Sequence, residues 1–149
     1  MREVLRQQLG QSVADALETL AFVACAPLDG TPDLPDRAIV CRISFTGPHA
    51  GTVEAAMPLA LAADIAATLT GAPPADDGAA EDCARELLNV TCGRLLRGLP
   101  AEALERTQML LPQVDPCDVA AWAALAAAPS AALFDADGHP LIVALKAAA

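Results

Sequence analysis

Residues 81–100 read EDCARELLNVTCGRLLRGLP, and their apolar periodicity predicts a helix around which the rest of the chain is organised. At ~100° per residue, Asp82, Glu86 and Asn89 fall within an arc of roughly 60° on one side of this helix. The opposite side carries the residues that would face a core, namely Ala84, Leu87, Leu88, Thr91 and Leu95. Asn89 is the only asparagine of the chain, and Asn inside a helix costs roughly 0.5–0.7 kcal/mol relative to Ala. The polar stripe therefore breaks a local folding rule without an evident folding gain, which is where functional residues are expected.

This polar stripe has two possible explanations, a solvated surface or a functional site. Most acidic and amide residues on the surface of a helix simply stay solvated, and the stripe by itself favours that explanation. A longer pattern favours a functional site: Glu86 follows Asp82 after three residues, Asn89 follows after two more, and Pro112 follows after another twenty-two. With average residue usage, this four-point pattern arises by chance in roughly one chain in a thousand of this length.

The pattern resembles the signature of the CheC/CheX/FliY family of chemotaxis phosphatases. The segment RISFTGPHAGTVEAAMPLALAADIAATLTG, residues 42–71, also resembles the strand–turn–strand–helix unit that precedes the motif helix in CheX-like proteins. Together the similar parts extend from about residue 39 to residue 112. CheC-type relatives carry a second acid–amide pair on the first helix, but here Glu18 is followed by Ala21 where the amide would stand. The chain is therefore most similar to CheX-like members, which have a single motif.

The resemblance implies a phosphatase that hydrolyses the aspartyl phosphate of a response-regulator receiver domain such as CheY. It implies that Asn89 orients a water in line with the phosphorus and that Glu86 pairs with a lysine of the receiver. Asp82 and Pro112 are then supporting residues: Asp82 supports the helix or its contacts, and Pro112 shapes the backbone beside the site. The protein would need no cofactor or metal of its own, because the receiver supplies the Mg²⁺.

The residue types of the stripe agree with a site that a partner completes. No Ser, Cys or Lys with a neighbouring base lies in the stripe, so a covalent nucleophile is not expected there. A convex helix face has no walls that would shift the pKa of Asp82 or Glu86 for acid–base work. Two alternatives stay open. One is a binding module that docks on a receiver or on a flagellar motor component without turnover, and the other is an unrelated Ala-rich structural domain, in which the stripe would be buried or disordered.

Size and charge limit the classes of function. With 149 residues, the chain is most simply one domain spanning residues 1–149. A net charge of −10 and a pI of about 4.3 provide no basic patch for nucleic acid and disfavour binding to an acidic membrane surface. The same charge favours partners that expose Lys or Arg.

Cysteine usage and the absence of targeting segments predict a cytoplasmic protein. The five cysteines include no C-x-x-C pair, and two histidines do not complete a metal site with them. Buried thiols in a reducing compartment are the simpler explanation. We find no signal sequence and no run of about 18 apolar residues that would span a membrane.

The remaining segments alternate between helical and extended patterns. Helices are predicted over residues 2–24, 58–70 and 115–127, in addition to the motif helix. Strands are predicted over residues 39–45, 52–57, 107–111, 131–134 and 140–145, with loops over 26–36 and 72–80. Pro58 and Gly71 would begin and end the second helix, and Asp76 or Asp77 would cap the motif helix. The single tryptophan, Trp122, is expected to pack rather than to bind a partner.

These elements predict an α+β fold in which an antiparallel sheet of five strands carries two long helices on one face. The expected architecture agrees with the two-layer CheC-like fold that the resemblance implies. The closing strand, Leu141–Leu145, is apolar and would favour pairing with a second copy if it formed a free edge. A homodimer is therefore compatible with the sequence.

Overall fold

In this computed structural model, the described part of the chain is residues 2–147. Within that range the chain forms five helices and seven strands. In chain order they are α1 (Arg2–Ala21), β1 (Cys25–Pro27), β2 (Ala38–Thr46), β3 (Gly51–Pro58), α2 (Leu59–Thr70), α3 (Asp77–Leu96), α4 (Ala101–Glu105), β4 (Gln108–Met109), β5 (Gln113–Pro116), α5 (Val119–Ala126), β6 (Ala132–Ala136) and β7 (His139–Ala147).

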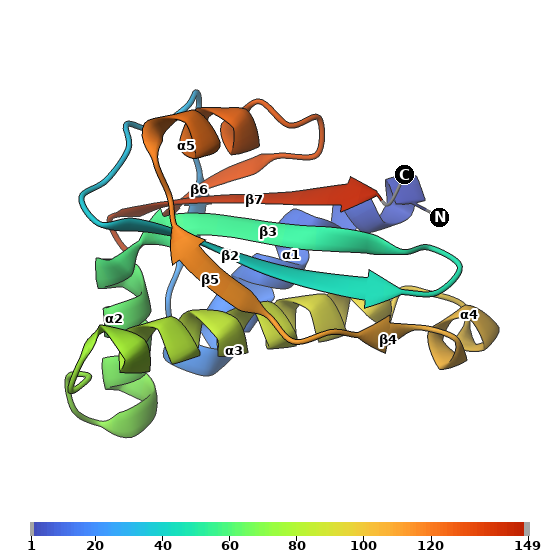
Figure 1. The fold of residues 1–149 in the computed structure, drawn as a ribbon, viewed down its shortest axis with the longest axis horizontal. Coiled ribbons are helices and arrows are strands. Elements are labelled where there is room, and N and C mark those ends of the chain that lie inside the picture. The colour runs from blue at the N-terminus through green and yellow to red at the C-terminus, as the bar shows by residue number, and fades with distance from the viewer. Residues whose placement is uncertain (1, 148–149) are drawn as a thin grey trace.

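The seven strands form one antiparallel sheet, with β3 and β7 at its centre (Figure 1). The order is β1-β6-β7-β3-β2, and both β4 and β5 pair with the outer side of β2. β1 belongs to the first part of the chain but pairs with β6 near its end, where Cys25 lies opposite Ala136. One edge of the sheet is therefore formed by the pairing of two segments that are far apart in the sequence.

The helices are divided unequally between the two faces of this sheet. The three helices α1, α2 and α3 pack over the main hydrophobic core on one face, and the short α5 packs against β7 and β3 on the other (Figure 1). Under α5, Trp122 is buried and its indole N–H donates a 2.8 Å hydrogen bond to the carbonyl oxygen of Pro32, which confirms its packing role. The predicted α+β class with two long helices on one face is confirmed. The sheet has more strands than predicted, and α5 adds a partial layer on the second face.

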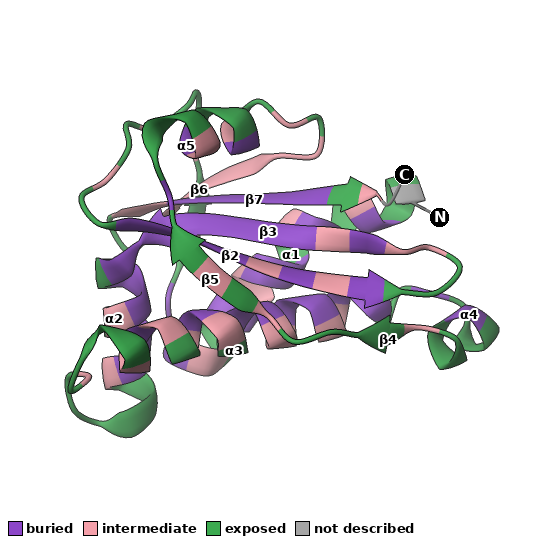
Figure 2. Cartoon of the chain, viewed as in Figure 1, coloured by how far each residue is buried: buried purple, intermediate pink, exposed green. Residues whose placement is uncertain are grey.

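Alternation along β2 explains which of its faces is covered. The side chains of Ile39, Cys41, Ile43 and Phe45 are buried toward the helices, as the sequence predicts. Arg42, which points to the other face, is only partly buried. Figure 2 shows that buried residues dominate the central strands β7, β3 and β2. The sheet thus presents a largely apolar face on which the long helices pack.

The segment between β4 and α5 differs from the prediction. Asp115 and Pro116 were predicted to begin the last helix, but they lie in β5 and pair with β2. The helix begins at Val119, because a side-chain oxygen of Asp118 accepts a 2.8 Å hydrogen bond from the N–H of Ala121 and caps the first turn. The strand predicted over residues 107–111 is shortened to Gln108–Met109.

The edges of the sheet also differ from the prediction. Cys25–Pro27, at the border between the predicted first helix and the predicted loop, forms the edge strand β1. Leu141–Leu145 would favour pairing with a second copy only as a free edge, but β7 lies between β6 and β3. Its apolar character is explained by burial in the centre of the sheet, so it gives no reason to expect a homodimer.

Backbone conformation sets the ends of the first two helices. α1 ends at Ala21, before the predicted end at residue 24, and the next residue, Phe22, has a φ of 56°. Pro58 is the last residue of β3 and precedes the first turn of α2. Gly71 ends α2 with a φ of 79°, as predicted. Within residues 2–147, none of the helices has the length and hydropathy needed to cross a membrane.

Candidate functional site

The helix α3, which carries the predicted motif, is held at its N-terminus by side-chain contacts. Asp76 has an extended backbone, and its Oδ1 accepts a 2.8 Å hydrogen bond from the N–H of Ala79. Asp77 in the first turn forms an ion pair with Arg37 and also favours the positive end of the helix. Of the two predicted capping residues, Asp76 is therefore the cap. These contacts fix the first turn and hence the direction in which later side chains point.

The two sides of α3 differ as its periodicity predicts. The inward side chains are buried against the sheet and the neighbouring helices, and they are Ala80, Ala84, Leu87, Leu88, Thr91, Cys92, Leu95 and Leu96. Asp82 and Glu86 are exposed, and Asn89 is half-buried. The alternative of an unrelated domain with a buried stripe is therefore contradicted.

The polar residues of the stripe differ in their contacts. Asp82 accepts a hydrogen bond through Oδ1 from an Arg85 guanidinium nitrogen at 2.6 Å. Within residues 2–147, this pair is the only side-chain hydrogen bond or ion pair of the stripe, so the carboxylate of Glu86 and the amide of Asn89 have no partner. Glu86 and Asn89 thus keep their full capacity to bind groups brought by another molecule.

Arg85 is a contact residue that sequence reasoning did not identify. Its i, i+3 spacing from Asp82 is a recognised signal for an ion pair on a helix, so it could have been found. Arg85 also approaches β2: burial raises the pKa of the Cys41 thiol to about 12, and the positive charges of Arg85 and Arg42 oppose that rise. The charge of Arg85 therefore acts on β2 as well as on Asp82.

Pro112 lies in the break between β4 and β5. Before it, the N–H of Leu110 donates a 2.8 Å hydrogen bond to the carbonyl oxygen of Ser44, and after it Gln113 pairs with Arg42. Proline has no N–H and cannot continue the ladder, which explains the interruption. Because α3 packs against both β2 and β5, this break is in the edge segment that runs past the motif helix (Figure 1).

The stripe offers neither a thiolate nor a cluster of metal ligands. Burial raises the pKa of the Cys83 thiol, and the carboxylates of Asp82 and Glu86 raise it further, so this thiol stays protonated near neutral pH. Among residues 2–147, no three His, Cys, Asp or Glu side chains lie close enough together to hold a metal ion. A groove of about 740 Å³ lies along α1 and is lined by no residue of α3. The stripe lies on the outer surface of α3, so its chemistry is that of an exposed carboxylate and a half-buried amide without hydrogen-bond partners within residues 2–147.

Comparison with known proteins relates these features to one family. Residues 39–116 match the family described as chemotaxis phosphatase CheX. Among solved structures, the chemotaxis protein CheX from Vibrio vulnificus has a TM-score of 0.75 at 17% identity, and the match covers 99% of this chain and 99% of that chain. CheX from Desulfovibrio desulfuricans has a TM-score of 0.70 at 16% identity, with 97% and 99% covered.

A third solved structure contains a partner. It is the CheX–CheY–BeF3–Mg²⁺ complex from Borrelia burgdorferi, with a TM-score of 0.68 at 13% identity, covering 96% of this chain and 97% of that chain. At such identities, likeness to these structures shows the fold alone. A search of curated proteins found no match to the chain.

Proposed function

Because the chain belongs to the chemotaxis phosphatase CheX family, we propose that it hydrolyses the aspartyl phosphate of a CheY-like receiver domain. The observation that carries the proposal is the placement of Glu86 and Asn89 on the outward face of α3, where neither side chain is engaged within residues 2–147. The Borrelia burgdorferi structure, in which CheX is in complex with CheY, supports a receiver as the partner.

In this proposal, Asn89 positions the attacking water. The water oxygen forms a bond to phosphorus while the bond from phosphorus to the aspartyl oxygen breaks. The receiver keeps its free carboxylate, and the released inorganic phosphate takes both protons of the water. An amide can accept and donate hydrogen bonds without adding negative charge beside the phosphoryl oxygens. The contribution of the chain is positioning, since phosphoryl transfer requires little covalent chemistry from the protein.

Glu86 sets the docking geometry in the same proposal. Its unpaired carboxylate binds a lysine of the receiver, and the net charge of −10 favours an approach by positively charged groups. Asp82 has a supporting role, because its carboxylate is already bound by Arg85. Pro112 shapes the edge segment next to the motif helix. The receiver supplies the Mg²⁺, and this chain contributes no cofactor.

We further infer that residues 1–149 act as one domain in the cytoplasm. All five cysteines are free, which agrees with a reducing compartment.

The proposal is tested by measuring phosphate release from a panel of phosphorylated receiver domains, with and without the protein. We expect the protein to accelerate release from at least one receiver above its own autodephosphorylation rate. Binding to a receiver without any acceleration would identify a binding module instead. Neither binding nor acceleration across a broad panel would contradict the receiver as substrate.

A further inference from the structure

The end of α1 holds an aromatic residue in a backbone conformation that favours glycine. Phe22 has a φ of 56°, in the left-handed region that bulky residues rarely adopt. Its N–H donates a 3.0 Å hydrogen bond to the carbonyl oxygen of Glu18, as in a left-handed C-cap, where glycine is the usual residue. The helix end would form at least as well with glycine, so the local structure does not explain a phenylalanine.

The side chain of Phe22 is also poorly explained by packing. It is 83% exposed, whereas Phe45 and Trp122 are each 2% exposed. The chain has only three Phe, one Trp and no Tyr, so an exposed aromatic residue is uncommon here. A bulky residue in a left-handed backbone conformation costs free energy, and such outliers cluster at functional sites.

Phe22 lies at the end of α1 that is next to the motif half of α3. The two helices pack side by side and run antiparallel, because Gln8 lies against Gly98 while Thr19 accepts a 3.0 Å hydrogen bond from Arg94. Both helices bury their inner sides on the same face of the sheet, so their exposed sides point away from the sheet together. Helix axes about 8–10 Å apart are easily spanned by one interface of about 800 Å² per partner.

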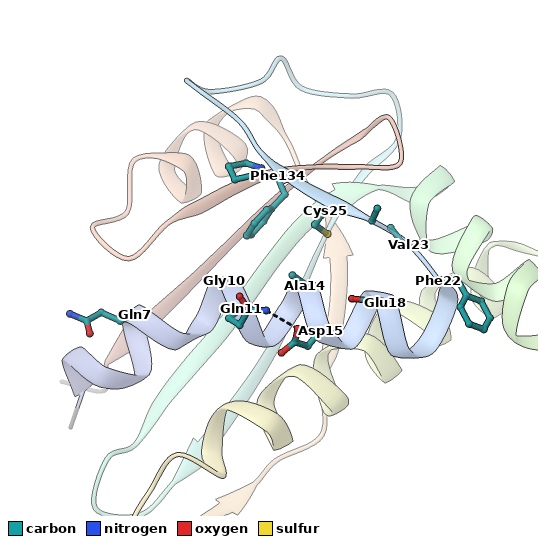
Figure 3. A pocket seen from close by; sticks show the side chains of 12 residues that line it. Gln7, Gly10, Gln11, Ala14, Asp15, Glu18, Phe22, Val23, Cys25 and Phe134 are labelled. Atoms are coloured by element: carbon teal, nitrogen blue, oxygen red, sulfur yellow. Dashed lines mark hydrogen bonds between the residues drawn. The ribbon is translucent and has the colours of Figure 1, made fainter.

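The surroundings of Phe22 indicate the chemistry of the surface that fits there. Phe22 lies at one end of the groove of about 740 Å³, which runs between α1 and the strands β1 and β6 on the flank of α1 away from α3 (Figure 3). Val23 and Phe134 contribute apolar surface to the groove, and Asp15 and Glu18 contribute carboxylates. No Lys or Arg is among its lining residues. A matching surface therefore presents an apolar side chain beside a lysine or arginine.

We propose that Phe22 is the apolar anchor on which the receiver docks while its phosphorylated aspartate meets Asn89. The inference rests on the proposed function, because it names a second contact with the same receiver. A receiver that brings a lysine to Glu86 presents a positively charged face, and the carboxylate of Glu18 beside Phe22 complements it. A second copy of this chain fits less well, because each copy carries a net charge of −10.

The anchor is tested with Phe22→Gly, which separates stability from docking. Glycine adopts the left-handed conformation without strain, so we expect the melting temperature to rise by about 2–4 °C. Loss of the anchor should raise KM for the phosphorylated receiver about 10-fold and leave kcat within about 2-fold, because Phe22 does not touch the reacting atoms. A structural role for Phe22 predicts the opposite change in melting temperature.

Two further variants control the experiment. Phe22→Leu keeps an apolar side chain, and we expect it to keep KM within about 3-fold of the wild-type value. Val119→Ala trims another exposed apolar residue, 66% exposed on α5 over the other face of the sheet, and should leave KM unchanged. An unchanged KM in Phe22→Gly overturns the anchor. A lower melting temperature with a higher KM in both Phe22 variants also overturns it, because that result assigns a structural role.

Failure of the proposed function gives a different result from failure of the anchor. If the wild-type protein releases no phosphate, the proposed function fails, and the dissociation constants of the receiver for wild type and Phe22→Gly are compared by calorimetry. A weaker complex with Phe22→Gly supports the anchor even then. Equal dissociation constants, or no binding by the wild type, overturn it.

Discussion

α1 and α3 are neighbouring helices of 20 residues each on the same face of the sheet, yet their exposed sides differ in chemistry. Both carry polar residues at positions i, i+4 and i+7. On α1 these are Gln11, Asp15 and Glu18, and on α3 they are Asp82, Glu86 and Asn89. Both helices thus pack on the same face of the sheet, and they differ in a few exposed side chains.

The contacts of these side chains make the difference sharper. On α1 the middle acid, Asp15, accepts a 2.7 Å hydrogen bond from the side-chain amide of Gln11. On α3 the middle acid, Glu86, has no partner within residues 2–147. Three residues after its acid, α3 carries the amide of Asn89, whereas α1 carries Ala21 three residues after Glu18, and a methyl group cannot hydrogen-bond a water. In the proposed function, packing on this face of the sheet is therefore not sufficient, and the site also depends on an unpaired acid followed by an amide.

The largest effect is expected from Asn89→Ala, which removes the amide that α1 lacks. We expect kcat to fall about 10²–10³-fold, in the range seen when one positioned hydrogen-bonding group is removed, while receiver binding is largely retained. Stability should not fall, because Ala is the better helix former by about 0.5 kcal/mol. Phosphate-release kinetics and thermal unfolding measure both. Asn89→Asp places a carboxylate that would repel phosphoryl oxygens and should be equally inactive, and wild-type turnover in either variant would remove the assigned role.

A smaller effect is expected from Glu86→Ala, which removes the unpaired acid of α3. Loss of one charge-assisted contact should weaken receiver binding about 10-fold and also lower turnover. The wild-type KM should rise with salt more steeply than that of the variant, because the lost contact is ionic. Glu102→Ala, an exposed acid on α4, is the matched control. Equal salt dependence in wild type and Glu86→Ala would contradict an ion pair with the receiver.

An effect of similar size, about 10-fold, is expected on the alkylation rate of Cys25. This measurement tests whether the groove beside α1 contains a reactive thiol. Burial, with the carboxylates of Asp137 and Asp135, raises the pKa of this thiol from 9.0 to about 11. A raised pKa lowers the thiolate fraction at pH 8 about 100-fold, and the greater nucleophilicity of a more basic thiolate offsets part of that. Alkylation by iodoacetamide, followed by mass spectrometry, should be about 10-fold slower than for an unperturbed thiol. The rate should increase with pH up to about 11, and rapid alkylation at pH 8 would contradict the assignment.

The smallest effect is expected from Asp82→Ala, which breaks the ion pair with Arg85. Because the side chain of Asp82 is 76% exposed, the free energy of unfolding should change by less than about 0.5 kcal/mol. We expect kcat/KM to fall no more than about 3-fold, because Asp82 pairs with Arg85 and is not assigned a contact with the receiver. Chemical denaturation and phosphate release measure the two quantities. A loss approaching that of Asn89→Ala would mean that Asp82 contacts the receiver or its phosphoryl group directly.

Much of the fold was predictable wherever a pattern is local. The buried side of β2 follows from the alternation of Ile39, Cys41, Ile43 and Phe45, and the end of α2 follows from Gly71. By contrast, Asp115 and Pro116 resemble a helix start, but the capping residue is Asp118, and the preceding segment is extended because it pairs with β2. A three-residue strand such as β1 has no periodicity to detect. It exists only because β6 lies beside it.

The candidate site shows the same division. The side of α3 on which Asp82, Glu86 and Asn89 lie follows from their spacing, since helical geometry converts sequence separation into angle. The pairing of Asp82 with Arg85 could also have been predicted, because the two residues are three positions apart on one helix. The strained, exposed Phe22 was not, because nothing in its local sequence marks the conformation of the helix end.

The amino-acid order by itself determined the long helices, the alternation of β2 and the polar stripe, because each depends on residues close together in the chain. Only the tertiary structure decided the order of strands, the burial of β7 at the centre, the edge that carries Pro112, and the placement of Phe22 next to the motif half of α3. Those features depend on which distant segments bury each other's apolar surfaces. Those contacts form only when the whole chain packs, so no short segment of the sequence determines them.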